Sequence, residues 1–302
     1  MINNGLAFYR AMYRIRRFEE TVLEEFKRGV FAGTTHTSLG QEANAVGVIS
    51  ALQPQDIIVT NHRCHGHFLA SGGDMRALFA EMIGRVSGVG GGRGGSQHIH
   101  WRNLYSNGVQ GGIVPIATGM AFAEKQNKTG AIVAVFIGDG TFGEGIIYEA
   151  FNMARLWSLP LLIVVEHNHI AQTTPTAMVQ VGQLAERIRA FEIPVNELDS
   201  SDVDEIHQAA VKAAETVRRE QLPSALLLHT VRFGPHSKGD DTRDVTELRA
   251  LQEIRDPLKI LGQRLSPAAL TTVEGEVDQE VSYAFAQALS DPPAVLEGGQ
   301  NG

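Results

Sequence analysis

The chain has 302 residues, of which 43% are hydrophobic and 20% charged, and its formal net charge is −8. This composition is ordinary for a globular protein and excludes a fibrous repeat or a disordered chain. The acidic balance argues against a nucleic-acid-binding surface, which needs a basic stripe, and a single cysteine, Cys64, excludes a disulfide framework.

No leader-like apolar segment and no membrane-spanning stretch stands out in the sequence. We therefore expect a cytoplasmic protein whose partners include neither a membrane nor a nucleic acid. The length allows one large domain or two small ones. We favour one α/β domain over residues 1–290, followed by a frayed C-terminal tail at 291–302.

The N-terminal part of the chain predicts helices and a strand. Apolar side chains near helical spacing predict an amphipathic helix over residues 6–28, which Gly29 ends. A second helix, rich in Ala and Val, is expected over 41–52. A short strand over 56–60 then carries the polar residues 61–66 at its end.

A glycine-rich stretch follows. Residues 87–96 hold six glycines and no apolar period, so we expect a loop that lies across the mouth of a site. The chain stays rich in glycine up to Gly112. An Ala-rich helix is then predicted over 118–125.

The middle of the chain predicts a βαβ unit. Apolar runs at 131–137 and 159–165 flank a helix predicted over 144–157. Both runs are almost wholly apolar, which is typical of parallel strands that are buried on both faces. We therefore expect a mainly parallel sheet.

The C-terminal part continues the alternation. A strand is expected at 194–195, a helix over 203–220 and a buried strand over 224–231. Residues 232–244 are rich in Gly, Pro, Ser and Asp, which predicts a mobile surface loop, and loops of this length are often functional. The residues between this loop and the tail are predicted to be helical.

Two polar residues stand at the ends of neighbouring predicted strands. Asp139 follows the first strand of the βαβ unit between Gly138 and Gly140, and Asn168 follows the second. Because a right-handed crossover places the two strands side by side, their carboxyl ends should meet. Carboxylate and amide oxygens suit Mg²⁺, and the glycines let phosphate approach the backbone. A tight turn is the alternative for residues 138–140 taken alone.

The segment from Gly138 to Asn168 resembles the thiamine diphosphate motif. The resemblance extends over most of the chain through the ordered segments 40–43, 62–66, 94–98, 152–160 and 234–237. Together they resemble the α subunit of a 2-oxo acid dehydrogenase E1 component, of the pyruvate, acetoin or branched-chain type. This implies an α/β thiamine diphosphate-binding fold of three layers, with a mainly parallel central sheet and helices on both faces.

The resemblance also implies a cofactor site. Asp139 and Asn168 would hold Mg²⁺ together with the main-chain carbonyl of Ile170. The implied cofactor-binding residues are His62, Arg63, Gly108, Gln110, Asp139, Gly140, Thr141, Asn168 and His236. Guanidinium donors suit phosphate, although a surface ion pair is the alternative for Arg63. Exposed N–H groups at Gly140 and Thr141, at a helix start, would favour an anion.

Histidines provide the implied catalytic groups. His36 and His236 match family histidines near the reacting carbon, and His236 would stabilise a substrate carboxylate or oxyanion, or transfer a proton, once its loop closes. A solvated or structural role is the alternative for either one alone. We expect no second metal, because His65, His67, His98 and His100 do not form a closed ligand set.

Some positions depart from the family pattern. The family usually has Glu-Asn-Asn followed by Tyr two places on, whereas residues 166–170 read Glu-His-Asn-His-Ile here. His62 replaces a common Tyr, and Gln97 a common Met. These changes surround the implied cofactor and substrate, so they leave the identity of the substrate open.

The implied function is decarboxylation of a 2-oxo acid, or cleavage of acetoin, with transfer of the acyl group to a lipoyl carrier. A separate β subunit, in an α₂β₂ heterotetramer, would supply the glutamate that activates the cofactor, and a lipoyl-bearing E2 would be a further partner. The alternative is a split transketolase-like carboligase that passes the enamine to an aldehyde or carbonyl acceptor. A noncatalytic scaffold is a third hypothesis, which the joint presence of Arg63, Asp139 and Asn168 opposes.

Overall fold

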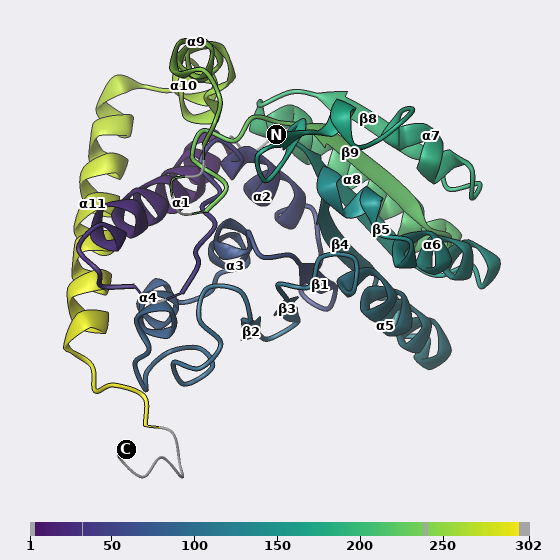
Figure 1. The fold of residues 1–302 in the computed structure, drawn as a ribbon, viewed down its shortest axis with the longest axis horizontal. Helices are drawn as coiled ribbons and strands as arrows, with labels where there is room; N and C mark the ends of the chain where they lie inside the picture. Colours follow the sequence, from purple (N-terminus) through teal and green to yellow (C-terminus); the bar gives the residue numbers. More distant parts are fainter. Residues whose placement is uncertain (1–3, 32, 238, 240, 296–302) are drawn as a thin grey trace.

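A seven-stranded sheet runs through the centre of the computed structural model (Figure 1). The structure describes residues 4–31, 33–237, 239 and 241–295. In spatial order the strands are β2 (His100–Trp101), β3 (Leu104–Ser106), β1 (Ile57–Thr60), β4 (Val133–Gly138), β5 (Leu161–His167), β9 (Ser224–His229) and β8 (Val195–Asp199). All neighbouring pairs are parallel except β2 and β3. The predicted mainly parallel sheet is confirmed.

The central strands are almost wholly apolar because helices cover both of their faces. Along β4, Ala134 and Phe136 belong to one buried cluster, while Val133, Val135 and Ile137 belong to the other. This alternation follows from the two-residue period of a strand. The sheet therefore separates two apolar cores.

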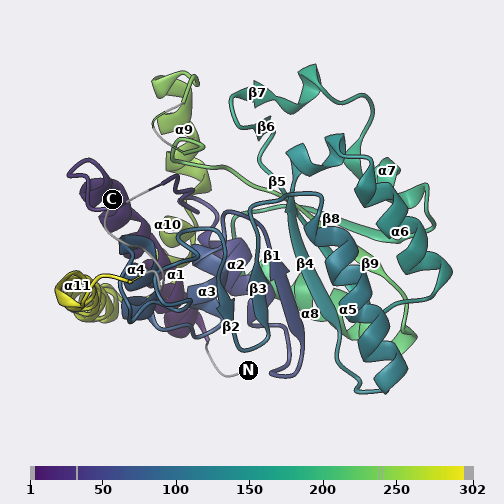
Figure 2. The same cartoon turned by 60° about the horizontal axis from the view of Figure 1, so that its bottom comes forward.

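One core lies against the helices α1 (Gly5–Phe26), α2 (Glu42–Ile49), α3 (His65–Ala70), α4 (Met75–Ile83), α8 (Val203–Glu220), α10 (Pro257–Gly262) and α11 (Pro267–Ser290). The other lies against α5 (Ile113–Asn127), α6 (Ile146–Leu156) and α7 (Leu184–Arg189). Figure 2 shows these helix layers on either side of the sheet. The predicted three-layer α/β fold is confirmed.

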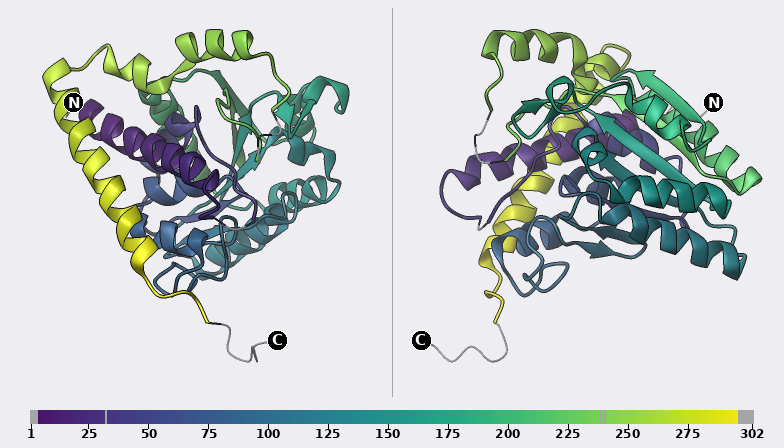
Figure 3. Two further views of the ribbon diagram at one scale, coloured as in Figure 1. Left: turned by 60° about the vertical axis from the view of Figure 1, so that its left-hand side comes forward. Right: turned by 45° about the vertical axis from the view of Figure 1, so that its right-hand side comes forward.

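The long C-terminal helix α11 lies against α1 (Figure 3). Arg14 pairs with Glu280 at 2.7 Å, and Arg17 pairs with Asp278 at 2.7 Å. These pairs are partly exposed, so each contributes little by itself. The α9 helix (Val245–Arg255), which precedes α10, has no buried residue.

Most predicted elements are present with shifted ends. The predicted first helix is α1, and Gly29 follows it with a φ of 75°. The helix predicted over 118–125 is the central part of the longer α5. The sequence reasoning missed α3 and α4. Most side chains of α4 are buried, so the helical spacing of its apolar residues is weak. The sequence nevertheless holds typical cap residues at both ends: Asp74 accepts a bond from the Ala77 N–H, and Gly84 ends the helix with a φ of 77°.

The glycine-rich loop has a different role from the predicted one. Residues 87–96 wrap around Glu81, whose carboxylate accepts bonds from the N–H groups of Gly90, Gly92 and Gly94 at 2.5–2.8 Å. A Cβ at Gly88 would lie 2.6 Å from the Glu81 backbone, so a side chain is excluded there. None of residues 87–96 lines the cavity described below, where the prediction had placed them; they bury a carboxylate instead.

The segment 232–244 has no helix or strand among its described residues, which exclude 238 and 240. Its beginning is not a surface loop, however, because Arg232 is only 1% exposed. Arg243 folds back and donates a bond to the Gly234 carbonyl at 2.8 Å. The start of the loop is tied to the body, because Arg232 donates to the Gln172 carbonyl at 3.2 Å and Phe233 N donates to the Leu39 carbonyl at 2.8 Å, and Arg243 ties the end of the loop to its start.

The predicted tail at 291–302 begins in an ordered position. Val86 N donates to the Pro292 carbonyl at 3.0 Å, and Ala294 N donates to the Gly84 carbonyl at 2.8 Å. The prediction of a frayed tail is wrong for residues 291–295, and 296–302 lie outside the described residues. Among the described helices, none combines the length and the apolar character that a membrane crossing requires.

Candidate functional site at the carboxyl edge of the sheet

A cavity of about 400 Å³ opens at the carboxyl ends of β1, β4 and β5. It lies where the strand order reverses, because β3 pairs with one side of β1 and β4 with the other. Ligands of parallel α/β sheets bind at such a switch point. All predicted site residues line it: His36, His62, Arg63, Gly108, Gln110, Asp139, Gly140, Thr141, Asn168, Ile170 and His236. The tertiary structure thus brings all predicted site residues to the wall of one cavity; the role of each residue stays a prediction.

Asp139 is the buried carboxylate of this cavity. Its Oδ2 accepts a bond from Thr176 Oγ1 at 2.9 Å and is bonded to His167 Nδ1 at 2.9 Å. Its Oδ1 accepts one bond, from the Gly140 N–H at 2.9 Å. A carboxylate oxygen has room for about two partners, so Oδ1 has a lone pair left for a cation.

The hairpin after β5 supplies two further oxygens. Asn168 Oδ1 accepts one bond, from Ile170 N at 3.2 Å. Ile170 begins the short strand β6 (Ile170–Ala171), which pairs with β7 (Thr174–Pro175). The register partner of Ile170 is Pro175, which has no N–H to offer the Ile170 carbonyl. Carboxylate, amide and main-chain oxygens together form a donor set that suits Mg²⁺.

The turn after Asp139 differs in detail from the prediction. It is a short 3₁₀ helix, η1 (Asp139–Gly143), and α6 begins only after it. The Gly140 N–H already donates to the Asp139 carboxylate. An anion at this turn would therefore compete with a bond that holds the carboxylate in place.

Arg63 is a buried cation beside this donor set. Burial lowers the pKa of its guanidinium to about 10, against the effect of Glu166 and Glu19, so it stays charged at neutral pH. One of its N–H groups donates to the Thr37 carbonyl. Within the described residues no ion pair involves Arg63. A buried charge without an ion-pair partner is costly, so an anionic ligand would be strongly favoured here.

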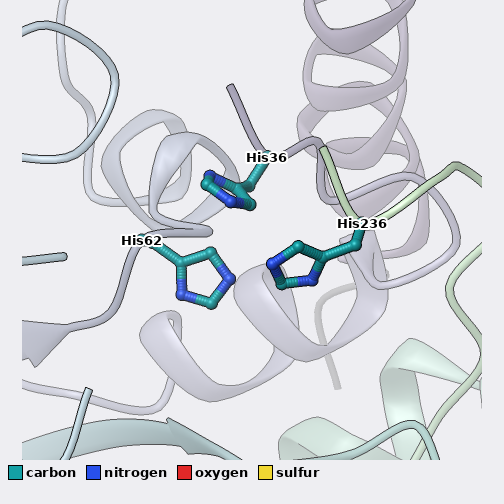
Figure 4. A group of neighbouring side chains, drawn as sticks. All are labelled: His36, His62 and His236. Carbon is teal, nitrogen blue, oxygen red and sulfur yellow. The ribbon is translucent and has the colours of Figure 1, made fainter. Parts of the chain in front are cut away.

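Three histidines from separate segments meet in the wall of this cavity (Figure 4). The ring centroids of His36 and His62 are 4.3 Å apart, those of His36 and His236 4.7 Å, and those of His62 and His236 5.2 Å. We call His36, His62 and His236 the first triad.

Within the first triad, His62 is held in its neutral form. Burial, followed by Arg63 and the other two histidines, holds the pKa of His62 well below its usual value. The Gln110 amide donates to Nδ1 of this ring, so the proton of neutral His62 sits on Nε2. Nε2 is buried and has no hydrogen-bond partner among the described residues. It is a donor available to a ligand.

Sequence reasoning missed several residues of the cavity wall. Burial raises the pKa of the Glu166 carboxyl to about 7, although a bond from the Asn44 amide and the charge of Arg63 both oppose this shift. Gln41 Oε1 is buried and without a hydrogen-bond partner in the described part of the chain. Glu144 accepts the Gly111 N–H at 2.8 Å and so holds the turn that carries Gly108 and Gln110. Glu166 was detectable, because it stands two places before Asn168 at the same strand end.

A family model described as "Dehydrogenase E1 component" matches residues 10–296. The pyruvate dehydrogenase E1 component subunit alpha of Zymomonas mobilis is 38% identical over 291 residues, which cover 94% of this chain and 82% of the relative. The protein of the same name from Rhizobium meliloti is 34% identical, with 96% and 87% covered. The somatic, mitochondrial form from Sus scrofa is 33% identical, with 97% and 78% covered.

Proposed function

The chain belongs to the dehydrogenase E1 component family, as an α subunit of the thiamine diphosphate-dependent 2-oxo acid dehydrogenases, and we propose that it decarboxylates pyruvate and passes the acyl group to a lipoyl carrier. The choice of pyruvate rests on the names of its relatives. The single observation that carries the proposal is the cavity that joins a buried cation, three hard oxygen donors and three histidines.

We assign the diphosphate end of the cofactor to Arg63, Asp139, Asn168 and Ile170. Asp139 Oδ1, Asn168 Oδ1 and the Ile170 carbonyl would hold Mg²⁺, because each has room for another partner. The ion would take its remaining ligands from phosphate and water. Arg63 would bind phosphate oxygens, and their negative charge would offset the cost of burying this otherwise unpaired cation.

The remaining lining residues would orient the organic part of the cofactor and the substrate. When bound, thiamine diphosphate supplies a nucleophilic carbon for attack on the carbonyl of the 2-oxo acid. Gly108 and Gln110 would line the aminopyrimidine, and the Nε2–H of His62 would donate to a polar atom of the ligand. His36 and His236 would stand by the substrate carboxylate.

Glu166 adds a candidate for proton movement. A carboxyl with a pKa of about 7 exchanges its proton near neutral pH, which suits an acid or base in a closed site. His62 is unsuited to this role because it stays neutral. We therefore assign proton transfer to Glu166 or to the histidines at positions 36 and 236, and binding to His62.

A β subunit would complete the cavity in an α₂β₂ assembly. Val109, between the lining residues Gly108 and Gln110, is 62% exposed, and Val181, which follows the Gln180 whose amide donates to the Asp139 carbonyl, is 89% exposed. Ile116 on α5 and Ile146 at the start of α6 are also exposed. Exposed apolar side chains gathered around a site are typical of a protein interface. We retain residues 1–290 as one domain of that assembly, in a cytoplasmic protein.

The decisive experiment uses the α chain copurified with its β partner. With thiamine diphosphate and Mg²⁺ present, we expect reduction of dichlorophenolindophenol by pyruvate, more slowly by branched-chain 2-oxo acids and acetoin. Transfer to a lipoyl domain is then measured as acyl-lipoyl formation. If the complex instead forms product only when an aldehyde acceptor is added, the carboligase hypothesis replaces the dehydrogenase hypothesis.

A further inference from the structure

A second group of three histidines lies beside Asp139, outside the set used above. His167 ends β5, His229 ends β9, and His169 stands in the turn before β6. Ring centroids are 3.9 Å apart for His167 and His169, and 5.2 Å for either of them and His229. One ring nitrogen from each histidine lies within 4.8 Å of the others. We call these residues the second triad.

Sheet register brings two of these rings together. His167 and His229 are register partners on adjacent parallel strands, so their side chains stand side by side on the same face. His169 adopts a left-handed backbone conformation with a φ of 66°, which histidine tolerates better than most residues, and this turn returns its ring to the other two. Strand pairing and one turn therefore assemble the second triad.

The closest pair of nitrogens has the spacing of metal ligands. His169 Nε2 and His229 Nδ1 are 3.3 Å apart. Two nitrogens that each lie about 2.0–2.1 Å from one tetrahedral ion are separated by about 3.3 Å. The side chains of His167 and His229 are 12% and 22% exposed, and His169 is exposed, so an ion has a path from solvent.

Carboxylates stand behind the two outer rings. His167 Nδ1 is bonded to Asp139 Oδ2 at 2.9 Å, and His229 Nε2 is bonded to Glu197 Oε1 at 2.8 Å. Metal-binding histidines usually donate their other ring N–H to a carboxylate, which fixes the ring and raises its basicity. These bonds leave His167 Nε2 and His229 Nδ1 as the nitrogens that a cation would meet. The second triad thus has the inner ligands and the outer partners of a metal site.

We propose that His167, His169 and His229 bind one Zn²⁺ ion, with water in a fourth position. Three imidazoles and a water form a ligand set that suits zinc, whereas Mg²⁺ prefers oxygen. The bound ion joins the ends of β5 and β9 to the β6–β7 hairpin. The expectation of no second metal rested on histidines close together in sequence, whereas His229 is 60 positions from His169, and sheet register together with the turn at His169 makes them neighbours.

The zinc affinity of the full chain tests the site. The protein is first stripped of metal by a chelator and then titrated with Zn²⁺ in competition with a colorimetric chelator. We expect one tight ion per chain, and affinity at least about 10-fold weaker in His169→Ala and His229→Ala. Glu197→Gln keeps all three ligands, and we expect affinity about 10-fold to 100-fold weaker because the outer partner of His229 is weakened. Thermal unfolding with zinc should shift upward in the wild type and not in His169→Ala.

Matched variants separate this site from other histidines. His36→Ala removes one member of the first triad, and His98→Ala removes an exposed histidine outside both triads; both should retain the tight ion. Wild-type affinity in His169→Ala, or loss of the ion in His36→Ala alone, would overturn the proposal. Co²⁺ gives a second readout: the strong visible absorption of a four-coordinate ion is expected, and a weak six-coordinate spectrum contradicts it. Neither readout depends on the proposed enzymatic activity.

Discussion

The two triads each consist of three histidines, but the charges around them have opposite signs. The first triad lies beside Arg63, whose charge adds to burial in keeping His62 neutral. The second lies between two carboxylates, Asp139 and Glu197, that accept from its rings. A cluster of histidines therefore does not define a ligand by itself: neighbouring positive charge favours an anionic or neutral ligand, and neighbouring negative charge favours a cation.

Asp139 belongs to both regions. Its Oδ1 accepts the Gly140 N–H and is the oxygen that we assign to Mg²⁺, and its Oδ2 is bonded to His167 of the second triad. The two regions thus share one side chain, with the proposed diphosphate site on one side of it and the proposed zinc site on the other. Substitutions of the shared residue Asp139, of His62 in the first triad only, and of Gly140 in the adjoining backbone test whether the two regions behave differently.

The largest effect is expected from Asp139→Asn, because Asp139 contributes to both regions. The amide keeps the shape but removes the negative charge from a proposed Mg²⁺ ligand, so we expect affinity for thiamine diphosphate with Mg²⁺ to fall about 100-fold, or about 3 kcal/mol. Calorimetry on the complex with the β subunit measures it. Zinc affinity should fall too, by about 10-fold.

Asp199→Asn is the matched control for this variant. Asp199 also ends a parallel strand, but it pairs with Arg255, its side chain is 68% exposed, and it does not line the cavity. Its replacement should leave cofactor affinity unchanged. Equal affinities for Asp139→Asn and the wild type would contradict the assignment of Asp139.

The charge state of the first triad is tested by the pH dependence of folding. The pKa of His62 in the folded chain lies well below its usual value of about 6.5. As the pH falls below about 6.5, the unfolded chain therefore binds a proton at His62 while the native chain does not. The stability from this group is present above pH of about 6.5 and is lost as the pH falls, by up to about 1.4 kcal/mol per pH unit. His62→Gln should flatten the curve of unfolding free energy between pH 5 and 6.5.

Urea unfolding at several pH values measures this slope. His67 provides a positive control, because burial lowers the pKa of its ring to about 3 and His67→Gln should flatten the same curve. Parallel curves for the wild type and His62→Gln would mean that His62 takes up its proton in the folded chain. The first triad would then be cationic like Arg63, and the contrast with the second triad would weaken.

The smallest effect is expected from Gly140→Ala, which perturbs the backbone between the two regions. A Cβ at position 140 would lie 3.0 Å from Ala171 Cβ in the hairpin that follows His169. The hairpin must give slightly, so we expect a loss of about 1 kcal/mol in unfolding free energy. Gly143→Ala, in the same 3₁₀ helix with open space around it, is the control and should stay within about 0.5 kcal/mol. A greater loss in the control than in Gly140→Ala would refute the contact with Ala171.

Local patterns were enough to predict the fold and to nominate residues that line one cavity. Runs such as 131–137 predict buried parallel strands because every side chain on them must be apolar when both faces are covered. Topology then places Asp139 and Asn168 at one edge without any knowledge of distant residues. The loops were predicted less well, since the glycine-rich stretch folds around Glu81 and Arg232 is buried.

The amino-acid sequence by itself determined the layered fold and the family, and it nominated the residues of the proposed diphosphate site, because strand and helix periods and short motifs act over a few neighbouring positions. Only the tertiary structure decided the pKa of Glu166, the neutral state of His62 and the meeting of His167, His169 and His229. Burial and charge–charge interactions depend on distance in space. For His167, His169 and His229, sheet register and one left-handed turn set those distances, and spacing along the chain does not encode them.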